Sequence, residues 1–159
     1  MQRRFLADIG LDTLTACLDF RLAPLSTRRD MAMFGVIHRT ILGHGPVHFR
    51  KFFFLEACVN RRSARFARHP LQIHEHRDRR RLEIVKRSGL GLCSVYNLLP
   101  RECVDTFTVK SFQASLQGFL RYQAQRGMEN WHQLFSPRHK MHDHPSLRYS
   151  PSGTCRIFE

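Results

Sequence analysis

The chain has 159 residues, and its 26 lysines and arginines against 13 acidic residues give a formal charge of +13. A chain of this length forms one domain of ordinary size, or one domain with tails, and can fold without metal or disulfides. Its hydrophobic content of 42% is too high for an intrinsically disordered protein. The most apolar run, residues 52–55, is far shorter than the roughly 20 residues that span a bilayer. We therefore expect a globular, non-membrane protein whose positive charge attracts a polyanion such as nucleic acid.

The cysteines indicate a reducing compartment. They are odd in number, lie far apart and form no CxxC pair, so a disulfide framework is not expected. No secretory or transit signal is visible near the first residues. The protein is therefore expected to be intracellular, nuclear or cytoplasmic, and not secreted. The five cysteines are Cys17, Cys58, Cys93, Cys103 and Cys155.

Residues 1–55 are expected to form an N-terminal group of helices. Asp12 is a candidate N-cap for a helix that Pro24 closes. Ser26 or Thr27 can cap the following helix, which ends at a glycine at position 43. The apolar face of that helix is expected to consist of Met33, Val36, Ile37 and Ile41.

A short Phe-rich helix is predicted over residues 47–55, with Phe49, Phe52 and Phe53 on its apolar side. In one interpretation these aromatic side chains belong to the core. In the other, they form a face that docks onto a polymerase body or another chain.

Residues 56–87 are expected to form a basic linker. Between positions 61 and 87, ten lysines and arginines stand against three acidic residues, which is more than half of the excess charge of the chain. Such a stretch would contact phosphates without sequence preference, and Phe66, His69 and His74 could stack on bases. A solvated loop that only keeps the protein soluble is the alternative. The predicted nucleic-acid-binding residues are Arg61, Arg62, Arg65, Arg68, Arg77, Arg79, Arg80, Arg81, Lys86 and Arg87.

Residues 88–136 are expected to form a second helical group that packs on the first. Ser88 can cap a buried helix that Pro100 ends, and Thr108 can cap the helix with the clearest 3.6-residue period, which ends at Gly127. Residues 137–159 are rich in His, Pro and Ser and are expected to be a disordered tail. No segment alternates with the two-residue period of a strand. We therefore predict an all-α fold, a small irregular domain of about five to six helices.

Catalytic motifs are missing from the sequence. No two acidic residues are adjacent, whereas metal-dependent polymerases and nucleases need clustered carboxylates. No Gly-rich phosphate loop, GxSxG or HExxH motif is present. His139, His142 and His144 with Cys155 could supply four zinc ligands, but structural zinc sites present paired ligands on both sides, and here the second side is one cysteine. We predict no catalytic residue, no metal and no cofactor.

Three stretches of the chain, in this order, are similar to motifs of one family. They are LAPLSTRRDMAM at 22–33, continuing to the glycine at 43, then YNLLP at 96–100, and TVKSFQASL at 108–116. Over residues 20–138 the order and spacing resemble the region downstream of the polymerase domain in non-LTR (LINE-type) retrotransposon reverse transcriptases.

The resemblance implies a fragment of a long polyprotein, in which endonuclease and polymerase domains precede a helical region that helps hold template RNA or target DNA. The catalytic aspartates of the family lie in the polymerase domain and have no counterpart here. Residues 56–87 match no motif of the family. The expected function is a non-catalytic nucleic-acid-binding helical segment, with both RNA and DNA open as the ligand. The alternative is a protein–protein interaction module that docks through residues 47–55, and a zinc-dependent or cysteine enzyme is a third hypothesis.

Overall fold

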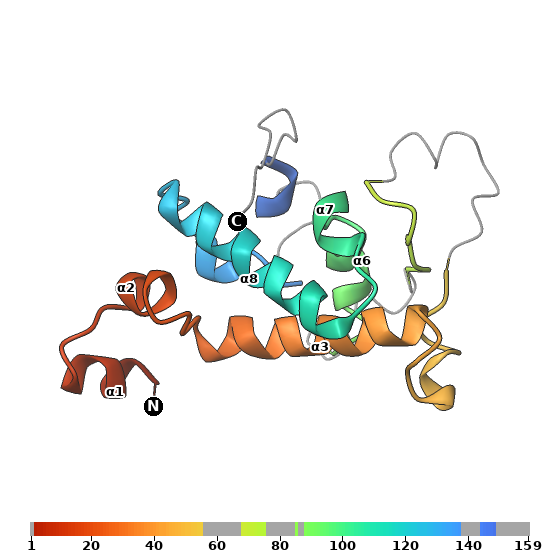
Figure 1. The fold of residues 1–159 in the computed structure, drawn as a ribbon, viewed down its shortest axis with the longest axis horizontal. Helices are drawn as coiled ribbons and strands as arrows, with labels where there is room; N and C mark the ends of the chain where they lie inside the picture. The colour runs from red at the N-terminus through yellow and green to blue at the C-terminus, as the bar shows by residue number, and fades with distance from the viewer. Residues whose placement is uncertain (1, 56–67, 76–84, 86–87, 138–143, 149–159) are drawn as a thin grey trace.

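The computed structural model describes residues 2–55, 68–75, 85, 88–137 and 144–148 (Figure 1). Within these ranges the regular structure is helical, apart from one isolated antiparallel bridge between Leu55 and Ile73. The predicted all-α fold is confirmed for the described part of the chain. The elements are α1 (Gln2–Asp8), α2 (Thr13–Leu18), α3 (Leu25–Ile41), η1 (Val47–Phe49), α6 (Leu92–Tyr96), α7 (Arg101–Val104), α8 (Val109–Gln125), η3 (Trp131–Gln133) and η5 (Pro145–Arg148).

The long helices α3 and α8 lie side by side and run in roughly opposite directions (Figure 1). A glycine on α3, Gly35, lets them approach closely. A Cβ atom at this position would lie 3.2 Å from a side-chain carbon of Val109 and 2.6 Å from the Nε2 of Gln113. Helices α2, α6, α7 and η3 each pack against α3 or α8, whereas α1 packs against α2.

An aromatic cluster fills the space between α3, α6 and α8. Phe34 of α3 contacts Tyr96 of α6, with ring centroids 6.3 Å apart, and packs edge-on against Phe135 at 5.7 Å. Tyr96 in turn lies 6.1 Å from Phe112 of α8. All four side chains are fully buried. This cluster is the centre of the core.

Two of the predicted helix caps are confirmed. The side chain of Asp12 accepts from the Thr15 N–H at 2.6 Å at the start of α2, and the Thr108 hydroxyl accepts from the Ser111 N–H at 3.1 Å at the start of α8. The predicted cap at Ser26 or Thr27 is wrong, because α3 already begins at Leu25 and has no side-chain cap.

Thr27 is buried and has a tertiary role. Its hydroxyl donates to the carbonyl of His132, 105 residues away, at 2.7 Å. This bond joins α3 to η3, so the hydroxyl serves packing between distant segments and not the local helix end.

The predicted helix over 47–55 is wrong beyond its first turn. The chain forms only the 3-10 helix η1 and further turns, and Leu55 then pairs with Ile73 in the bridge. Phe52, Phe53 and Phe54 are consecutive, so no single helix face could bury all three. At the end of the segment, Leu55 is in an extended conformation and pairs with Ile73, and no helix forms there.

The buried helix expected after Ser88 is shorter than predicted. The Ser88 hydroxyl accepts from the Leu90 N–H at 3.2 Å in a local turn, and α6 begins only at Leu92. Beyond Pro100 the chain forms α7, which the sequence did not predict. Proline is favourable at the beginning of a helix as well as after its end.

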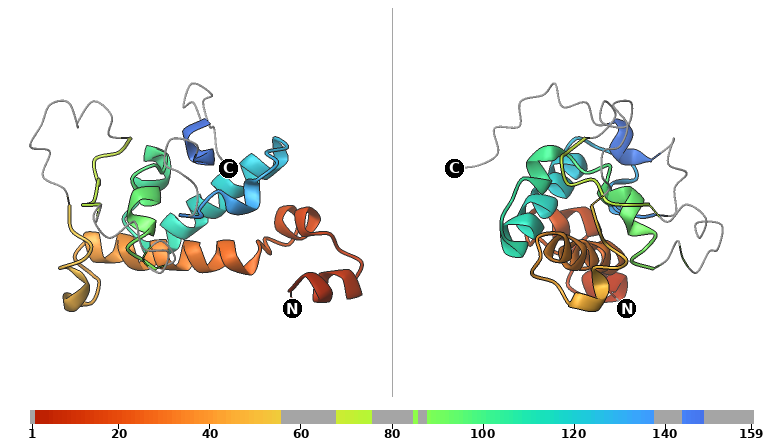
Figure 2. Two further views of the ribbon diagram at one scale, coloured as in Figure 1. Left: turned by 180° about the vertical axis from the view of Figure 1, so that it is seen from behind. Right: turned by 90° about the vertical axis from the view of Figure 1, so that its right-hand side faces the viewer.

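The segment expected to be a disordered tail is partly packed on the body. His144 and Ser146 are fully buried, and the Ser146 hydroxyl donates to the carbonyl of Leu134 at 3.4 Å. Both views in Figure 2 show η5 on the side of the α6–α8 layer that lies away from α3. Residues 138–143 and 149–159 lie outside the described residues. In the part of the chain that is described, no helix has the length and apolar character to cross a membrane.

Candidate nucleic-acid interface

Nine of the ten cationic residues predicted to contact phosphates lie outside the described residues, and their role stays a prediction. The tenth, Arg68, is half-buried. Its Nη1 donates to the carbonyl of Leu98 at 3.3 Å and to that of Ser146 at 2.9 Å, and burial lowers the pKa of its guanidinium. Arg68 therefore ties the linker to the end of α6 and to η5, which is a structural role.

Residues 68–75 form a fixed segment in the middle of the basic stretch. Ile73 is fully buried, and Asn97 bonds both of its backbone groups: Oδ1 accepts from the Ile73 N–H at 2.9 Å and Nδ2 donates to its carbonyl at 2.8 Å. The side-chain amide of Asn97 thus makes the two hydrogen bonds that the backbone of a neighbouring strand would make. We call residues 68–75 the anchor segment. It is the part of the basic stretch that packs on the body in the described residues.

The prediction that His69 stacks on bases is wrong. Only 3% of its surface is exposed, its Nε2 donates to the carbonyl of Tyr96 at 3.0 Å, and its ring meets the Tyr96 ring edge-on. Burial lowers the pKa of His69 to about 4. His74, another predicted base-stacking residue, is stacked on Phe54 with centroids 5.1 Å apart and planes 10° apart. The third residue, Phe66, lies outside the described residues.

A buried polar node connects α3 with α6 and α8. The Tyr96 hydroxyl lies 2.9 Å from Nδ1 of His38, and Nε2 of His38 lies 3.0 Å from the carbonyl of Thr106. A carbonyl only accepts, so Nε2 carries the proton and Nδ1 accepts from the tyrosine. The His38 ring stacks on Phe112 at 4.1 Å, and burial lowers its pKa while raising that of Tyr96. Both ring nitrogens of His38 are hydrogen-bonded and both side chains are fully buried, so the node serves packing.

Cationic side chains gather at the C-terminal end of α3, which the sequence analysis did not single out. Nε of Arg39 donates to the carbonyl of His44 at 2.9 Å, and Nη2 of Arg50 donates to that of Gly43 at 2.7 Å. Lys51 places its Nζ 5.0 Å from the centroid of the Phe52 ring. All three cationic residues are exposed. In the sequence, this cationic group could have been recognised because no acidic residue lies between positions 31 and 55.

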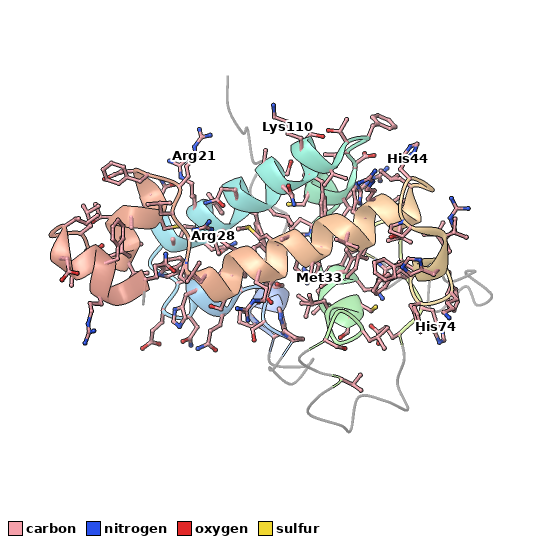
Figure 3. All side chains as sticks on the ribbon, turned by 90° about the horizontal axis from the view of Figure 1, so that it is seen from below. Arg21, Arg28, Met33, His44, His74 and Lys110 are labelled. Atoms are coloured by element: carbon pink, nitrogen blue, oxygen red, sulfur yellow. The ribbon has the colours of Figure 1, made fainter. Side chains whose placement is uncertain are left out.

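Further cations lie along the face where α3 and α8 meet. Figure 3 shows Arg21, Arg28 and Lys110 on this side of the molecule, and Met33 on the edge of α3 toward α6. The first three are exposed. The described surface therefore carries positive charge beyond the linker.

An open apolar pocket of about 460 Å³ lies between α3, η1 and the turn before α6. Phe49, Phe52 and Phe53 line it from one side, Met33 and Val36 from α3, and residues 88–90 from the third side. Phe53 is buried, while Phe49 and Phe52 are half-buried against the core. All three rings of the Phe-rich segment line the pocket, and the Phe53 ring is also buried in the core.

The zinc hypothesis for the tail loses one of its four residues. Nε2 of His144 lies 3.2 Å from the carbonyl of Ser136, and its Nδ1 accepts from the Ser146 N–H at 3.2 Å. Both ring nitrogens are used, which leaves no lone pair for a metal. His139, His142 and Cys155 lie outside the described residues. Within the ranges that the structure describes, no group of three or more His, Cys, Asp or Glu residues could hold a metal.

No protein-family model matches the chain, and no curated protein sequence or solved structure is similar to it. Functional reasoning therefore depends on the residues and on their geometry.

Proposed function

We propose that the chain is a non-catalytic nucleic-acid-binding segment, a fragment of a longer polyprotein that resembles the C-terminal part of LINE-type reverse transcriptases. It binds RNA or DNA through phosphate contacts of the cations in Arg61–Arg87 other than Arg68, and adds no reaction of its own. In this proposal it acts inside the cell, next to the polymerase body of the parent protein.

The concentration of charge is the observation that carries the proposal. Ten cations and three acidic residues between positions 61 and 87 form the densest positive stretch in the chain. Contacts of several cations with phosphates release counterions, which provides affinity without base readout. The anchor segment supports this function because it attaches the middle of the stretch to the body through Ile73 and Arg68.

A filter-binding titration of the full chain with labelled RNA and DNA tests the proposal. With six or more phosphate contacts, the affinity should fall by at least about a hundredfold between about 50 and 200 mM salt. Replacing Arg79, Arg80 and Arg81 together by glutamine should lower the slope of log affinity against log salt by about three.

The matched control is a triple variant with the same change in net charge at exposed arginines outside the stretch. Arg4, Arg101 and Arg126 replaced by glutamine should leave the slope within about one of the parent value. Equal effects of the two triple variants would show that only overall charge matters, and an affinity independent of salt would refute the proposal.

The alternative function is a protein interaction module that docks through residues 47–55. The apolar pocket lined by Phe49, Phe52 and Phe53 is the observation that favours it. Such a module should bind a partner protein or a second copy with an affinity that changes little with salt. A chain that sediments as a monomer and binds nucleic acid through this pocket would dispose of the alternative.

A further inference from the structure

The apolar pocket lies beside cations of α3 and of the Phe-rich segment. All of its lining residues come from positions 33–53 and 88–90. Arg39 follows the lining residue Val36 by about one turn of α3, and Arg50 and Lys51 stand in the sequence between the lining residues Phe49 and Phe52. An apolar cavity next to exposed positive charge is complementary to a ligand that is flat and apolar at one end and anionic at the other.

The contacts of the cations leave them able to bind a phosphate. A guanidinium has five N–H donors. Arg39 and Arg50 each use one of them on the turn at residues 43–44, and this holds both groups at the same end of α3. Lys51 lies over the ring of Phe52, which itself lines the pocket. Positive charge and aromatic surface thus meet within two consecutive residues.

We propose that this pocket receives an unpaired base of a single-stranded nucleic acid, whose backbone phosphates contact Arg50 and Lys51. The inference rests on the proposed function and adds that the chain distinguishes single strands from duplexes. In a duplex the bases are stacked on one another, and their faces cannot reach Phe49 and Phe52. A single strand offers free faces, and stacking on aromatic side chains provides affinity.

The lining also predicts that the identity of the base does not matter. Ser88 is the one polar side chain among the lining residues, and its hydroxyl already donates to the carbonyl of Val85 at 2.7 Å and accepts from the Leu90 N–H. The lining side chains therefore offer mainly apolar surface for stacking and few groups that could read the edge of a base. Every base has a π face, so stacking alone is tolerant of sequence.

Two phenylalanines two positions apart provide a matched test. Phe52 lines the pocket, whereas Phe54 does not line it and is stacked on His74. The Phe52→Leu and Phe54→Leu variants of the full chain are titrated with a labelled single strand of mixed sequence and with its duplex. Phe52→Leu should weaken single-strand binding about tenfold, the loss of one stacked base, and leave duplex binding unchanged. Phe54→Leu should change neither.

Two further measurements separate stacking from damage to the fold. Phe52→Trp keeps an aromatic face and should retain single-strand affinity, and thermal melts should show that all three variants fold. A 2-aminopurine base placed in the single strand should lose emission on binding to the parent chain and regain it in Phe52→Leu, because stacking quenches this probe.

The outcomes distinguish the two proposals. Salt-dependent binding with equal affinity for single strand and duplex, or equal effects at positions 52 and 54, would overturn the base pocket and leave the proposed function intact. Absence of any nucleic-acid binding would overturn both. A pocket variant that instead abolishes self-association or capture of an apolar peptide would assign the pocket to a protein partner and refute the inference.

Discussion

The helical pair α3–α8 and the irregular segments 47–55 and 68–75 reach burial by different means. In the pair, the backbone groups bond within each helix, and the side chains only need to pack. Phe34 and Phe112 do so from opposite helices. In the irregular segments the backbone bonds to groups that are distant in sequence: Ile73 bonds to the side chain of Asn97, and the His74 N–H donates to the carbonyl of Phe54.

This difference shows where the stability of the fold tolerates substitution and where it depends on single residues. A helix distributes its hydrogen bonds over many residues, so the loss of a surface side chain costs little. The anchor segment depends on Asn97, Arg68 and the neutral form of His69. The position of the anchor segment is therefore controlled by few groups, and each can be tested.

The largest effect is expected in the helical pair. Phe34→Ala removes a fully buried ring that contacts Tyr96 and Phe135, and should lower the free energy of unfolding by about 4 kcal/mol. Phe107→Ala is the matched control, since this ring is 90% exposed and its loss should cost less than about 0.5 kcal/mol. Chemical denaturation measures both. Similar losses at the two positions would contradict the position of the core.

A smaller effect, confined to the anchor segment, is expected from acid. The pKa of His69 is lowered to about 4 by burial, below its ordinary value of 6.5, and its Nδ1 has no hydrogen-bond partner. The folded chain therefore holds His69 neutral, and the stability it contributes is complete above pH 6.5. It should be lost as the pH falls from 6.5 toward 4, by about 3 kcal/mol.

The control for this pH dependence is a glutamine that cannot titrate. His69→Gln can still donate to the Tyr96 carbonyl and should flatten the fall of stability between pH 6.5 and 4, whereas His44→Gln, at an exposed position, should leave it unchanged. The lowered pKa of His38 adds a fall of the same sign. A pH profile that is identical in the His69 variant and the parent would show that another group is responsible.

The smallest of the three effects is expected from Asn97→Ala. It leaves the buried N–H and carbonyl of Ile73 without their partners and should lower the free energy of unfolding by about 2 kcal/mol. The amide of Ile73 should also exchange with solvent faster, while amides inside α8 keep their protection. Asn130→Ala, at an exposed position, is the control. Unchanged exchange at Ile73 would show that Asn97 does not hold the anchor segment.

The fold was predicted well where the sequence is periodic. Thr108 as a cap, the apolar face of α8 and the end at Gly127 all follow from local rules, and Gly127 has a φ of +72°, which favours glycine. The segment 47–55 was predicted poorly, because three consecutive phenylalanines specify burial but no period. Its conformation is set by the pairing of Leu55 with Ile73, a contact between residues that local rules do not relate.

For the candidate site too, some features could be predicted from the sequence and others could not. The basic stretch was visible as composition, and the aromatic residues of the pocket were singled out as a group. The roles of His69 and Arg68 were not visible, since an exposed and a buried residue of these types look alike in a sequence. Their burial follows from α6, whose carbonyls at Tyr96 and Leu98 accept their hydrogen bonds.

The sequence by itself determined the helical class, two of the helix caps and the strong positive charge, because these depend on residue type and on spacing within one or two turns. Only the tertiary structure decided that His69 lies in the core, that Asn97 pairs with Ile73 and that Phe52 lines a pocket beside Lys51. These features depend on contacts between residues far apart in the chain. Their energies arise when folding removes water from both partners at once.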